Sequence, residues 1–368
     1  MTTSTTSAKH YPPHEPTVPP AASVAGIKIA PVLSIPLQRR LQTLGTLLWL
    51  LLLPTSIVLT LVLLYLPSTR IAMVAYIIWV LYWDTAPETG GRKWGWVRNW
   101  VMWKWMAAYF PIEIRKEGEL DPSRNYLMGY HPHGVVSIGA WINIGTEATG
   151  FSSIFPGINL RLLTLVSNFN IFLFRDIILW LGVAGVSRRS IENIFAHGPG
   201  HSAAIVVGGA QECLYAKPGT MDLVLKKRLG FIKVAVLNKA LLVPIMSFGE
   251  NEAFDLIVTH PGSFGWKVQQ WCKSVWGWTM PAFNARGVFN YSVGLLPHRQ
   301  RIVTVFNKPV DPEEVVGRKF DPKELSSDEL QAIVQQVHAA YVKRLTDCWD
   351  KYKDELCPNR VKELDMVE

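Results

Sequence analysis

The sequence predicts an α/β fold in which a mostly parallel sheet, covered by helices, follows an N-terminal transmembrane or re-entrant helical hairpin. Two observations support this fold. From about residue 110 onward, short apolar runs at 203–207, 241–246 and 301–306 alternate with helical segments, as they do in a parallel sheet with helical crossovers. Before that point, residues 41–69 form an uncharged, mostly apolar run that is longer than the roughly 20 residues needed to cross a bilayer.

The first 36 residues are predicted to form a disordered N-terminal tail. They are rich in Pro, Ser, Thr and Ala and show no apolar periodicity, so they offer little surface for a packed core. No apolar segment follows the first methionine at the distance typical of a signal peptide, and we therefore expect no signal peptide.

Residues 37–85 are predicted to form the membrane hairpin. After the uncharged run, a second apolar run at 71–83 is short for a complete span, so two spans and one re-entrant loop both remain open. Basic residues flank the pair on both sides: Arg39, Arg40, Arg92, Lys93 and Arg98. The positive-inside rule then places both flanks in the cytosol. Two buried core helices are the alternative, which the absence of a polar face in the first run disfavours.

Tryptophans gather directly after the hairpin. Five lie close together: Trp94, Trp96, Trp100, Trp103 and Trp105. Because tryptophan favours the headgroup layer of a bilayer, this segment is predicted to be an interfacial helix, with a place in the core as the alternative for some of the five. A second group is expected to reach the same leaflet: Trp266, Trp271, Trp276 and Trp278.

Charge narrows the class of partner. The formal net charge is +8, and in a chain with 15 tryptophans this charge suits an anionic membrane surface or an anionic substrate. No nucleic-acid partner is expected, because zinc-finger spacing and aromatic-basic strand signatures are absent from the sequence. The four cysteines form no Cys-x-x-Cys pair and are expected to be reduced thiols.

The chain is predicted to end in an amphipathic helix that serves as scaffold. Ser326 and Glu329 have the spacing of a capping box. Apolar residues then recur at helical intervals: Leu330, Ile333, Val334, Val337 and Tyr341.

The Gly-Tyr-His-Pro-His-Gly run at 129–134 is the strongest candidate for chemistry. It follows a predicted strand, and its proline favours extended backbone at His131. Residues two apart in an extended segment point to the same side, so His131 and His133 are predicted to line one cavity. Gly134 would let a substrate approach the backbone closely. A metal site is the alternative, with Glu212 or His201 as a third ligand.

Two further clusters carry polar groups. Gly208 and Gly209 follow an apolar run and precede Glu212, which is therefore placed at the exit of a strand, where functional side chains of α/β sheets gather. Basic residues suited to an anionic ligand, or simply to a solvated face, form a patch: Lys226, Lys227, Arg228 and Lys233. The sequence has no Gly-x-Ser-x-Gly, no Walker loop and no Gly-x-Gly-x-x-Gly, which argues against a nucleophile-elbow hydrolase and against those nucleotide-binding folds.

The ordered motifs resemble those of the type-2 diacylglycerol acyltransferase family, which includes monoacylglycerol and wax-alcohol acyltransferases. The resemblance covers the hairpin and roughly residues 80–310. Its motifs are Tyr109-Phe110-Pro111, Tyr130-His131-Pro132-His133-Gly134, Phe174-Arg175-Asp176, Gly208-Gly209-Ala210-Gln211-Glu212, Arg228-x-Gly230-Phe231 and Phe248-Gly249-Glu250-Asn251. One departure is Asn238-Lys239, where the family usually has His-Gly.

The resemblance implies a glycerolipid-acyltransferase-like domain over residues 86–368, on the cytosolic face of the endoplasmic reticulum membrane, with lipid droplets as a second location. It implies acyl transfer from acyl-CoA to diacylglycerol, giving triacylglycerol. Acyl-CoA is then a substrate, and neither a cofactor nor a metal is expected. Monoacylglycerol and long-chain alcohols are alternative acceptors, and a non-catalytic lipid-droplet anchor is the alternative from another class. A homo-oligomer is left open.

An alcohol must lose its proton as it attacks a thioester, a task that suits imidazole. The resemblance implies that His133 is the base, that Glu212 orients it or stabilises its protonated form, and that His131 supports it. Backbone amides near Gly134 would stabilise the oxyanion. A covalent route through Cys213 is an alternative. The remaining motif positions are expected to bind substrate: Tyr109, Phe110, Pro111, Gly134, Arg175, Asp176, Gly208, Gly209, Arg228, Gly230, Phe231 and Asn251.

Overall fold

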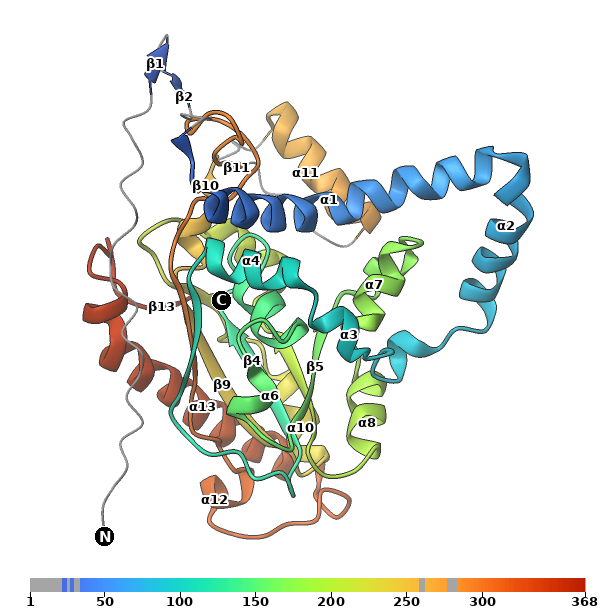
Figure 1. The fold of residues 1–368 in the computed structure, drawn as a ribbon. Helices are drawn as coiled ribbons and strands as arrows, with labels where there is room; N and C mark the ends of the chain where they lie inside the picture. Colours follow the sequence, from blue (N-terminus) through green and yellow to red (C-terminus); the bar gives the residue numbers. More distant parts are fainter. Residues whose placement is uncertain (1–21, 25–26, 30–33, 258–261, 277–282, 368) are drawn as a thin grey trace, which may run out of the picture.

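The computed structural model describes residues 22–24, 27–29, 34–257, 262–276 and 283–367. Its centre is a seven-stranded sheet in the order β3-β12-β9-β4-β7-β5-β6 (Figure 1). The strands are β3 (Ile112–Lys116), β4 (Tyr126–His131), β5 (Asn159–Thr164), β6 (Ala184–Gly185), β7 (His201–Val206), β9 (Leu241–Phe248) and β12 (Ile302–Phe306). The strands from β9 to β6 run parallel, and β12 and β3 run opposite to them. The predicted α/β class with a mostly parallel sheet is confirmed.

Helices cover both faces of this sheet. The longer ones in the domain are α4 (Val101–Tyr109), α8 (Arg188–Ala196), α10 (Gly230–Leu237), α11 (Phe264–Trp276) and α13 (Ser327–Leu356). Short helices join them: α3 (Gly95–Arg98), α5 (Ile138–Ala140), α6 (Phe151–Ile154), α7 (Phe174–Trp180), α9 (Gly209–Glu212) and α12 (Pro312–Val316). Outside the main sheet, short strands pair as β8 (Asp222–Val224) with β13 (Asp365–Val367) and β10 (Asp255–Leu256) with β11 (Phe283–Asn284).

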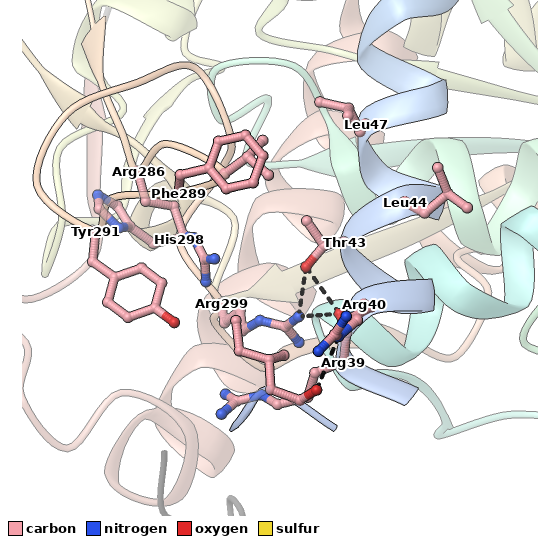
Figure 2. Close-up of a pocket in the computed structure, with 12 residues that line it drawn as sticks. Arg39, Arg40, Thr43, Leu44, Leu47, Arg286, Phe289, Tyr291, His298 and Arg299 are labelled. Carbon is pink, nitrogen blue, oxygen red and sulfur yellow. Dashed lines mark hydrogen bonds between the residues drawn. The ribbon is translucent and has the colours of Figure 1, made fainter. Parts of the chain in front are cut away.

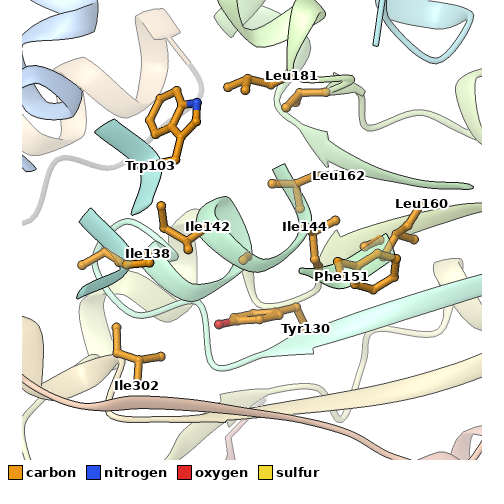
Figure 3. Close-up of a cluster of buried hydrophobic side chains, with 14 of the residues drawn as sticks. Trp103, Tyr130, Ile138, Ile142, Ile144, Phe151, Leu160, Leu162, Leu181 and Ile302 are labelled. Atoms are coloured by element: carbon orange, nitrogen blue, oxygen red, sulfur yellow. The ribbon is translucent and has the colours of Figure 1, made fainter. Parts of the chain in front are cut away.

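Strand β4 lies at the centre of the sheet and is buried along its whole length. Its side chains alternate between two cores, because successive residues of a strand point to opposite faces. Leu127 joins the core that contains Val337 of α13. Met128 and Tyr130 join the opposite core, whose members surround the segment after the strand (Figure 3). Burial on both faces therefore holds the end of β4 in place.

The C-terminal helix follows the sequence prediction. Ser326 Oγ accepts a hydrogen bond from the Glu329 N–H (3.3 Å), and Glu329 Oε2 accepts one from the Ser326 N–H (3.0 Å), which confirms the capping box. Val337 and Tyr341 are completely buried against the sheet. The helix is part of the scaffold, as predicted.

At the N-terminal end, α1 (Leu37–Tyr65) is the one helix in the described ranges that is long and apolar enough to cross a membrane. Helix α2 (Pro67–Tyr82) has 16 residues, which is short for a span. It leaves the end of α1 at a steep angle and does not run back alongside it (Figure 1). Two consecutive apolar helices are therefore present, but they do not form a side-by-side hairpin.

The first half of α1 packs closely on the domain. A Cβ atom at Gly45 would lie 2.8 Å from the Cβ of Trp105 on α4, so glycine is what permits this approach. Further along, Trp49 meets Trp141 edge to face, with ring centroids 6.2 Å apart. Beyond these contacts α1 exposes leucines and valines, such as Leu61 and Val62. One end of α1 is thus fixed to the sheet domain, and its other end projects from it (Figure 1).

The tryptophans after α2 divide between surface and core. Trp94 and Trp96 are exposed, as an interfacial segment requires. Trp103 is completely buried, and its indole N–H donates to the Val97 carbonyl (2.8 Å), so its assignment to the membrane interface is wrong. The helical period of α4 turns Trp103 toward the hydrophobic core of the domain. In the second group Trp271 is exposed on α11, whereas the Trp276 side chain and Trp278 lie outside the described residues.

Most of the predicted disordered tail also lies outside the described residues, which exclude 1–21, 25–26 and 30–33. Within the tail, β1 (Ala22–Val24) and β2 (Ile27–Ile29) form a short antiparallel pair.

Helix α10 ends in a left-handed turn at Lys239, the position where the sequence departs from the family motif. Lys239 has φ +53°, and its N–H donates to the Val236 carbonyl (3.2 Å). The Ala240 N–H donates to the Ala235 carbonyl (3.0 Å), which completes a Schellman motif. Glycine is the usual residue at this point, because a Cβ atom is strained in the left-handed region.

Lys239→Gly is expected to stabilise the protein by about 0.5 to 1 kcal/mol, because the strain it relieves exceeds the added entropy of the unfolded chain. The measurement is the thermal unfolding midpoint of the purified protein. Lys239→Ala is the matched control: it removes the charge, keeps the Cβ atom and is expected to leave the midpoint unchanged. A lower midpoint for the glycine variant would contradict this account of the turn.

Candidate active site

The candidate site lies where three neighbouring parallel strands end. Strand β4 lies between β7 and β9, and all three run in the same direction. His133 follows β4, Glu212 follows β7 and Glu250 follows β9. The carboxyl ends of parallel strands meet at one edge of a sheet, the edge where α/β proteins usually bind ligands.

The ring of His133 is held through Nδ1. This atom lies 3.1 Å from the Gly134 carbonyl oxygen and 3.0 Å from Cys213 Sγ. A carbonyl oxygen can only accept, so we assign the proton of the neutral ring to Nδ1. Nε2 then carries the lone pair. Burial lowers the pKa of His133 below its usual value of 6.5, although the bond to Gly134 opposes this shift. At neutral pH the side chain is therefore an uncharged imidazole with a basic Nε2.

Glu212 holds the main chain of His133. One carboxylate oxygen accepts from the His133 N–H (2.5 Å), and the other accepts from the Val224 N–H (2.8 Å). The predicted contact between this carboxylate and the imidazole is not what the structure shows, because both oxygens are used by main-chain donors. Gly208 makes room for the carboxylate, since a Cβ atom there would overlap Glu212 Oε2. Gly209 has φ +60° and begins α9, which carries Glu212.

Glu212 is almost completely buried. Burial raises its pKa to about 7, while the two N–H donors act in the opposite direction. The carboxyl group therefore titrates near neutral pH.

Cys213 lies beside the imidazole but is a poor nucleophile in this position. Burial raises the pKa of its thiol to about 12, and the neighbouring Glu212 carboxylate adds to the shift. The thiolate is the reactive form of cysteine, so very little of it exists at neutral pH. This environment disfavours the covalent alternative.

His131 faces away from His133. Its ring is completely buried, and Nε2 lies 2.9 Å from the hydroxyl of Tyr341 on α13. Burial lowers the pKa of His131 to about 3, so the ring is neutral at physiological pH. The prediction that both imidazoles line one cavity is wrong, because the strand ends at His131 and alternation along it no longer governs His133. His131 supports the site through its packing against α13.

Glu250 belongs to the same edge, and the sequence prediction left it out of the site. Oε1 accepts hydrogen bonds from the Tyr130 hydroxyl (2.5 Å) and the Gly139 N–H (2.7 Å), and Oε2 accepts one from the Ile138 N–H (3.1 Å). Burial raises the pKa of Glu250 to about 7, against the effect of these donors. The available signal was the same as for Glu212: a carboxylate directly after an apolar run that forms a parallel strand.

Main-chain donors lie next to His133. Gly134 has φ +59°, and a Cβ atom there would press on Glu250 at 3.2 Å, so glycine fits the turn. Among the described residues, the N–H groups of Gly134, Val135 and Val136 donate no protein hydrogen bond. These three donors are suited to an oxyanion. The N–H groups of Ile138 and Gly139 are not available, because Glu250 accepts from both.

The basic patch lies beside this edge. Arg228 donates to the Gln211 side chain (3.4 Å), one residue from Glu212, and Lys226 and Lys227 are exposed next to it. Gly230 is exposed at the first turn of α10. Arg228 and Gly230 therefore remain reachable by a ligand that enters at the strand ends.

Two residues that were predicted to bind substrate are buried and make contacts within the domain. Phe231 is buried against Tyr341, with ring centroids 5.3 Å apart. Asn251 is buried, and its amide donates to the Thr220 carbonyl (2.8 Å). Both stabilise the neighbouring backbone.

The Tyr109-Phe110-Pro111 segment joins α4 to β3; Tyr109 and Phe110 lie in the core, whereas Pro111 is exposed. The Tyr109 hydroxyl donates to the Pro297 carbonyl (2.5 Å), and the Arg299 guanidinium covers its ring at 4.0 Å. Phe110 is completely buried, and its carbonyl accepts from the Ile302 N–H (3.1 Å). The structure places these residues at the start of β12, where they fix the loop that precedes it.

Arg175 and Asp176 join the domain to the apolar helices. Arg175 is buried and pairs with Asp84, which follows α2 (2.6 Å). Asp176 accepts from the Tyr76 hydroxyl on α2. Arg92 contacts both carboxylates, at 2.5 Å from Asp84 and 3.5 Å from Asp176. This network fastens α7 to α2 and is separate from the His133 edge.

The structure separates His201 from the other residues that were weighed as metal ligands. His201 begins β7, whereas Glu212 follows the end of this strand. At roughly 3.3 Å per residue, the strand keeps His201 far from His133. Within the described ranges no three His, Cys, Asp or Glu side chains group as metal ligands would.

Comparison with known proteins identifies the family of this chain. A family model described as diacylglycerol acyltransferase matches residues 62–366. Diacylglycerol O-acyltransferases 2B and 2A of Umbelopsis ramanniana are 46% and 47% identical, over 92% and 91% of this chain and 95% and 93% of their own lengths. Human 2-acylglycerol O-acyltransferase 1 is 37% identical over 89% of this chain and 95% of its own length. The match covers most of the chain, and the protein belongs to the diacylglycerol acyltransferase family.

Proposed function

We propose that this enzyme transfers a fatty acyl group from acyl-CoA to the hydroxyl of diacylglycerol, giving triacylglycerol. One observation carries the proposal: a neutral, partly buried His133, held through Nδ1, follows β4 at the carboxyl edge of the sheet, and the next three residues carry N–H groups without protein partners among the described residues. The two relatives at 46% and 47% identity are named for diacylglycerol, and this supports the choice of acceptor.

In the proposed reaction Nε2 of His133 takes the proton of the acceptor hydroxyl as its oxygen attacks the thioester carbonyl. The tetrahedral oxyanion accepts hydrogen bonds from the N–H groups of Gly134, Val135 and Val136. The C–S bond then breaks and the carbonyl re-forms, giving the new ester. The departing thiolate of CoA receives the proton from the imidazolium, so the enzyme returns to its starting state without a cofactor.

Glu212 and Glu250 act as positioning residues in this proposal. Glu212 fixes the main chain at His133, and Glu250 fixes the helix that begins at Ile138. The turn that carries the oxyanion donors lies between these two anchors. A small error in its position would affect both the base and the oxyanion site.

The two substrates are proposed to arrive from different phases. The charged half of acyl-CoA suits the exposed patch formed by Lys226, Lys227 and Arg228, which lies close to Glu212. Diacylglycerol arrives from the bilayer that holds α1 and α2. We place the domain on the cytosolic face of the endoplasmic reticulum membrane, with lipid droplets as a second location.

2-Acylglycerol is the second candidate acceptor, because human and bovine relatives named for it are 37% identical to this chain. The chemistry at His133 would be the same. Only the fit of the acceptor distinguishes the two reactions.

Membranes that contain the protein, supplied with labelled acyl-CoA and equal amounts of diacylglycerol, 2-acylglycerol and a long-chain alcohol, are expected to make triacylglycerol as the main direct product. His133→Ala is expected to reduce acyl transfer at least 100-fold at equal protein abundance, since it removes the general base. His197→Ala is the control, because His197 is exposed before β7 at the opposite end of the sheet. Near-normal transfer by His133→Ala would end the proposed mechanism, and a different main product would change the acceptor.

Cys213→Ser is expected to retain acyl transfer within a few-fold of the unsubstituted enzyme, because the hydroxyl can still accept from His133 Nδ1. The initial rate with saturating acyl-CoA is the appropriate measurement. A loss comparable to that of His133→Ala, in folded protein, would favour the covalent route.

Glu250→Gln is expected to weaken the pH dependence of stability. The pKa of Glu250 is raised from 4.5 to about 7, so its stabilising protonated form is present at low pH and is lost as pH rises through 7. The shift corresponds to at most about 3 kcal/mol. Glutamine cannot ionise, so the unfolding midpoint of the variant should fall less between pH 5 and pH 8.

The exposed Glu324 provides the matched control for this experiment. Glu324→Gln should keep the pH dependence of the unsubstituted protein. An equal fall of the midpoint in Glu250→Gln and in this control would contradict the assignment.

A further inference from the structure

A second site lies outside the chemistry at His133. A cavity of about 550 Å³ opens between the first turns of α1 and the loop at 285–299 (Figure 2). Four arginines line it: Arg39, Arg40, Arg286 and Arg299. No Asp or Glu is among its described lining residues. The described wall of the cavity therefore gathers four guanidinium groups; His298, which also lines it, pairs with the Asp255 carboxylate (3.0 Å).

The guanidinium of Arg299 is oriented by hydrogen bonds to the first turns of α1. It donates to the side chains of Gln42 (2.5 Å) and Thr43 (3.1 Å) and to the Arg39 carbonyl (3.2 Å). These bonds hold the guanidinium at the wall of the cavity. Arg286 approaches from the opposite side and stacks on Tyr291, with its guanidinium carbon 4.7 Å from the ring centroid (Figure 2). Guanidinium groups held in this way suit a phosphate, which can accept several N–H bonds.

The other part of the wall is apolar. Leu44 and Leu47 of α1 face Phe289 of the loop (Figure 2). Phe289 is 67% exposed, and the same loop exposes Val293 and Leu295. Exposed apolar side chains beside the start of a candidate membrane span are expected to face lipid. The arginines at this end of α1 would then lie at the level of the headgroups.

We propose that this cavity binds the phosphate headgroup of an anionic membrane phospholipid, with an acyl chain along Leu44 and Leu47. Acyl-CoA also carries phosphate groups and an acyl chain, so it shares this ligand chemistry with an anionic phospholipid. The basic patch at Arg228 is the site proposed for CoA, and it follows β8, whereas this cavity lies beside α1. The lipid site is independent of the acyl-transfer proposal, and either could fail alone.

The test uses the purified full-length protein in a neutral detergent and follows its thermal unfolding midpoint during titration with dioctanoyl phosphatidic acid. We expect a saturable increase of the midpoint. Arg40→Gln/Arg286→Gln should require at least tenfold more lipid for half of the effect. Arg188→Gln/Arg318→Gln removes the same charge at two exposed positions outside the cavity and should behave as the unsubstituted protein. Arg286→Lys keeps the charge without the planar fork and should give an intermediate value, so it keeps the test decisive where the double variant fails to fold.

Three further ligands separate the sources of the effect. Dioctanoyl phosphatidylcholine and inorganic phosphate are each expected to raise the midpoint far less than phosphatidic acid. CoA is expected to change the unfolding midpoint of Arg40→Gln/Arg286→Gln and of the unsubstituted protein by the same amount. The assignment would be overturned if phosphatidylcholine or inorganic phosphate acted as potently as phosphatidic acid. It would also be overturned if Arg40→Gln/Arg286→Gln lost the effect of CoA, or if this variant responded to phosphatidic acid as the unsubstituted protein does.

Discussion

The arrangement of the site depends on one buried carboxylate. Glu212 joins the turn after β4 to the end of β8 by accepting from the N–H groups of His133 and Val224. Burying a carboxylate is unfavourable unless its lone pairs are used, and these two donors offset much of that cost. The pKa of Glu212 is still raised, which shows that the two donors do not offset the whole cost of burying the carboxylate. Gly208 is required beside the carboxylate because any side chain there would occupy its space. The position of the His133 ring follows from this arrangement.

Much of the fold could be predicted from apolar runs, because buried parallel strands need continuous apolar sequence. The same reasoning placed Glu212 at the exit of a strand, and applied to the run at 241–246 it would have placed Glu250 beside it. The contacts of these carboxylates could not be predicted from the sequence, because they depend on which main-chain N–H groups the folded turns leave free. His131 illustrates the limit: strand alternation holds only up to the last residue of β4, so its ring reaches Tyr341 on α13 and not the position of His133. Trp103 was assigned to the membrane by composition, whereas the helical period of α4 turns it into the core.

The contacts between the domain and the apolar helices α1 and α2 have a separate organisation. Arg175 is buried and needs carboxylate partners, which Asp84 and Asp176 provide. Tyr76 and Arg92 extend this network to α2 and to the segment that follows it. At the other end, α1 packs on α4 through Gly45. The domain is thus held to its apolar helices at two places, which keeps the edge that carries His133 at a defined position relative to them. The Phe174-Arg175-Asp176 motif, which the sequence resemblance groups with the His133 motif, therefore joins the domain to α2.

The central claim is that the acceptor hydroxyl attacks the thioester directly, after losing its proton to His133. The release of CoA from a single turnover of acyl-CoA on purified enzyme, with the acceptor left out, tests this claim most directly. Direct transfer predicts no rapid release of CoA until diacylglycerol is added, because the C–S bond cannot break without the attacking hydroxyl. A burst close to one CoA per enzyme molecule, with the acyl group covalently bound to the protein, would contradict the account.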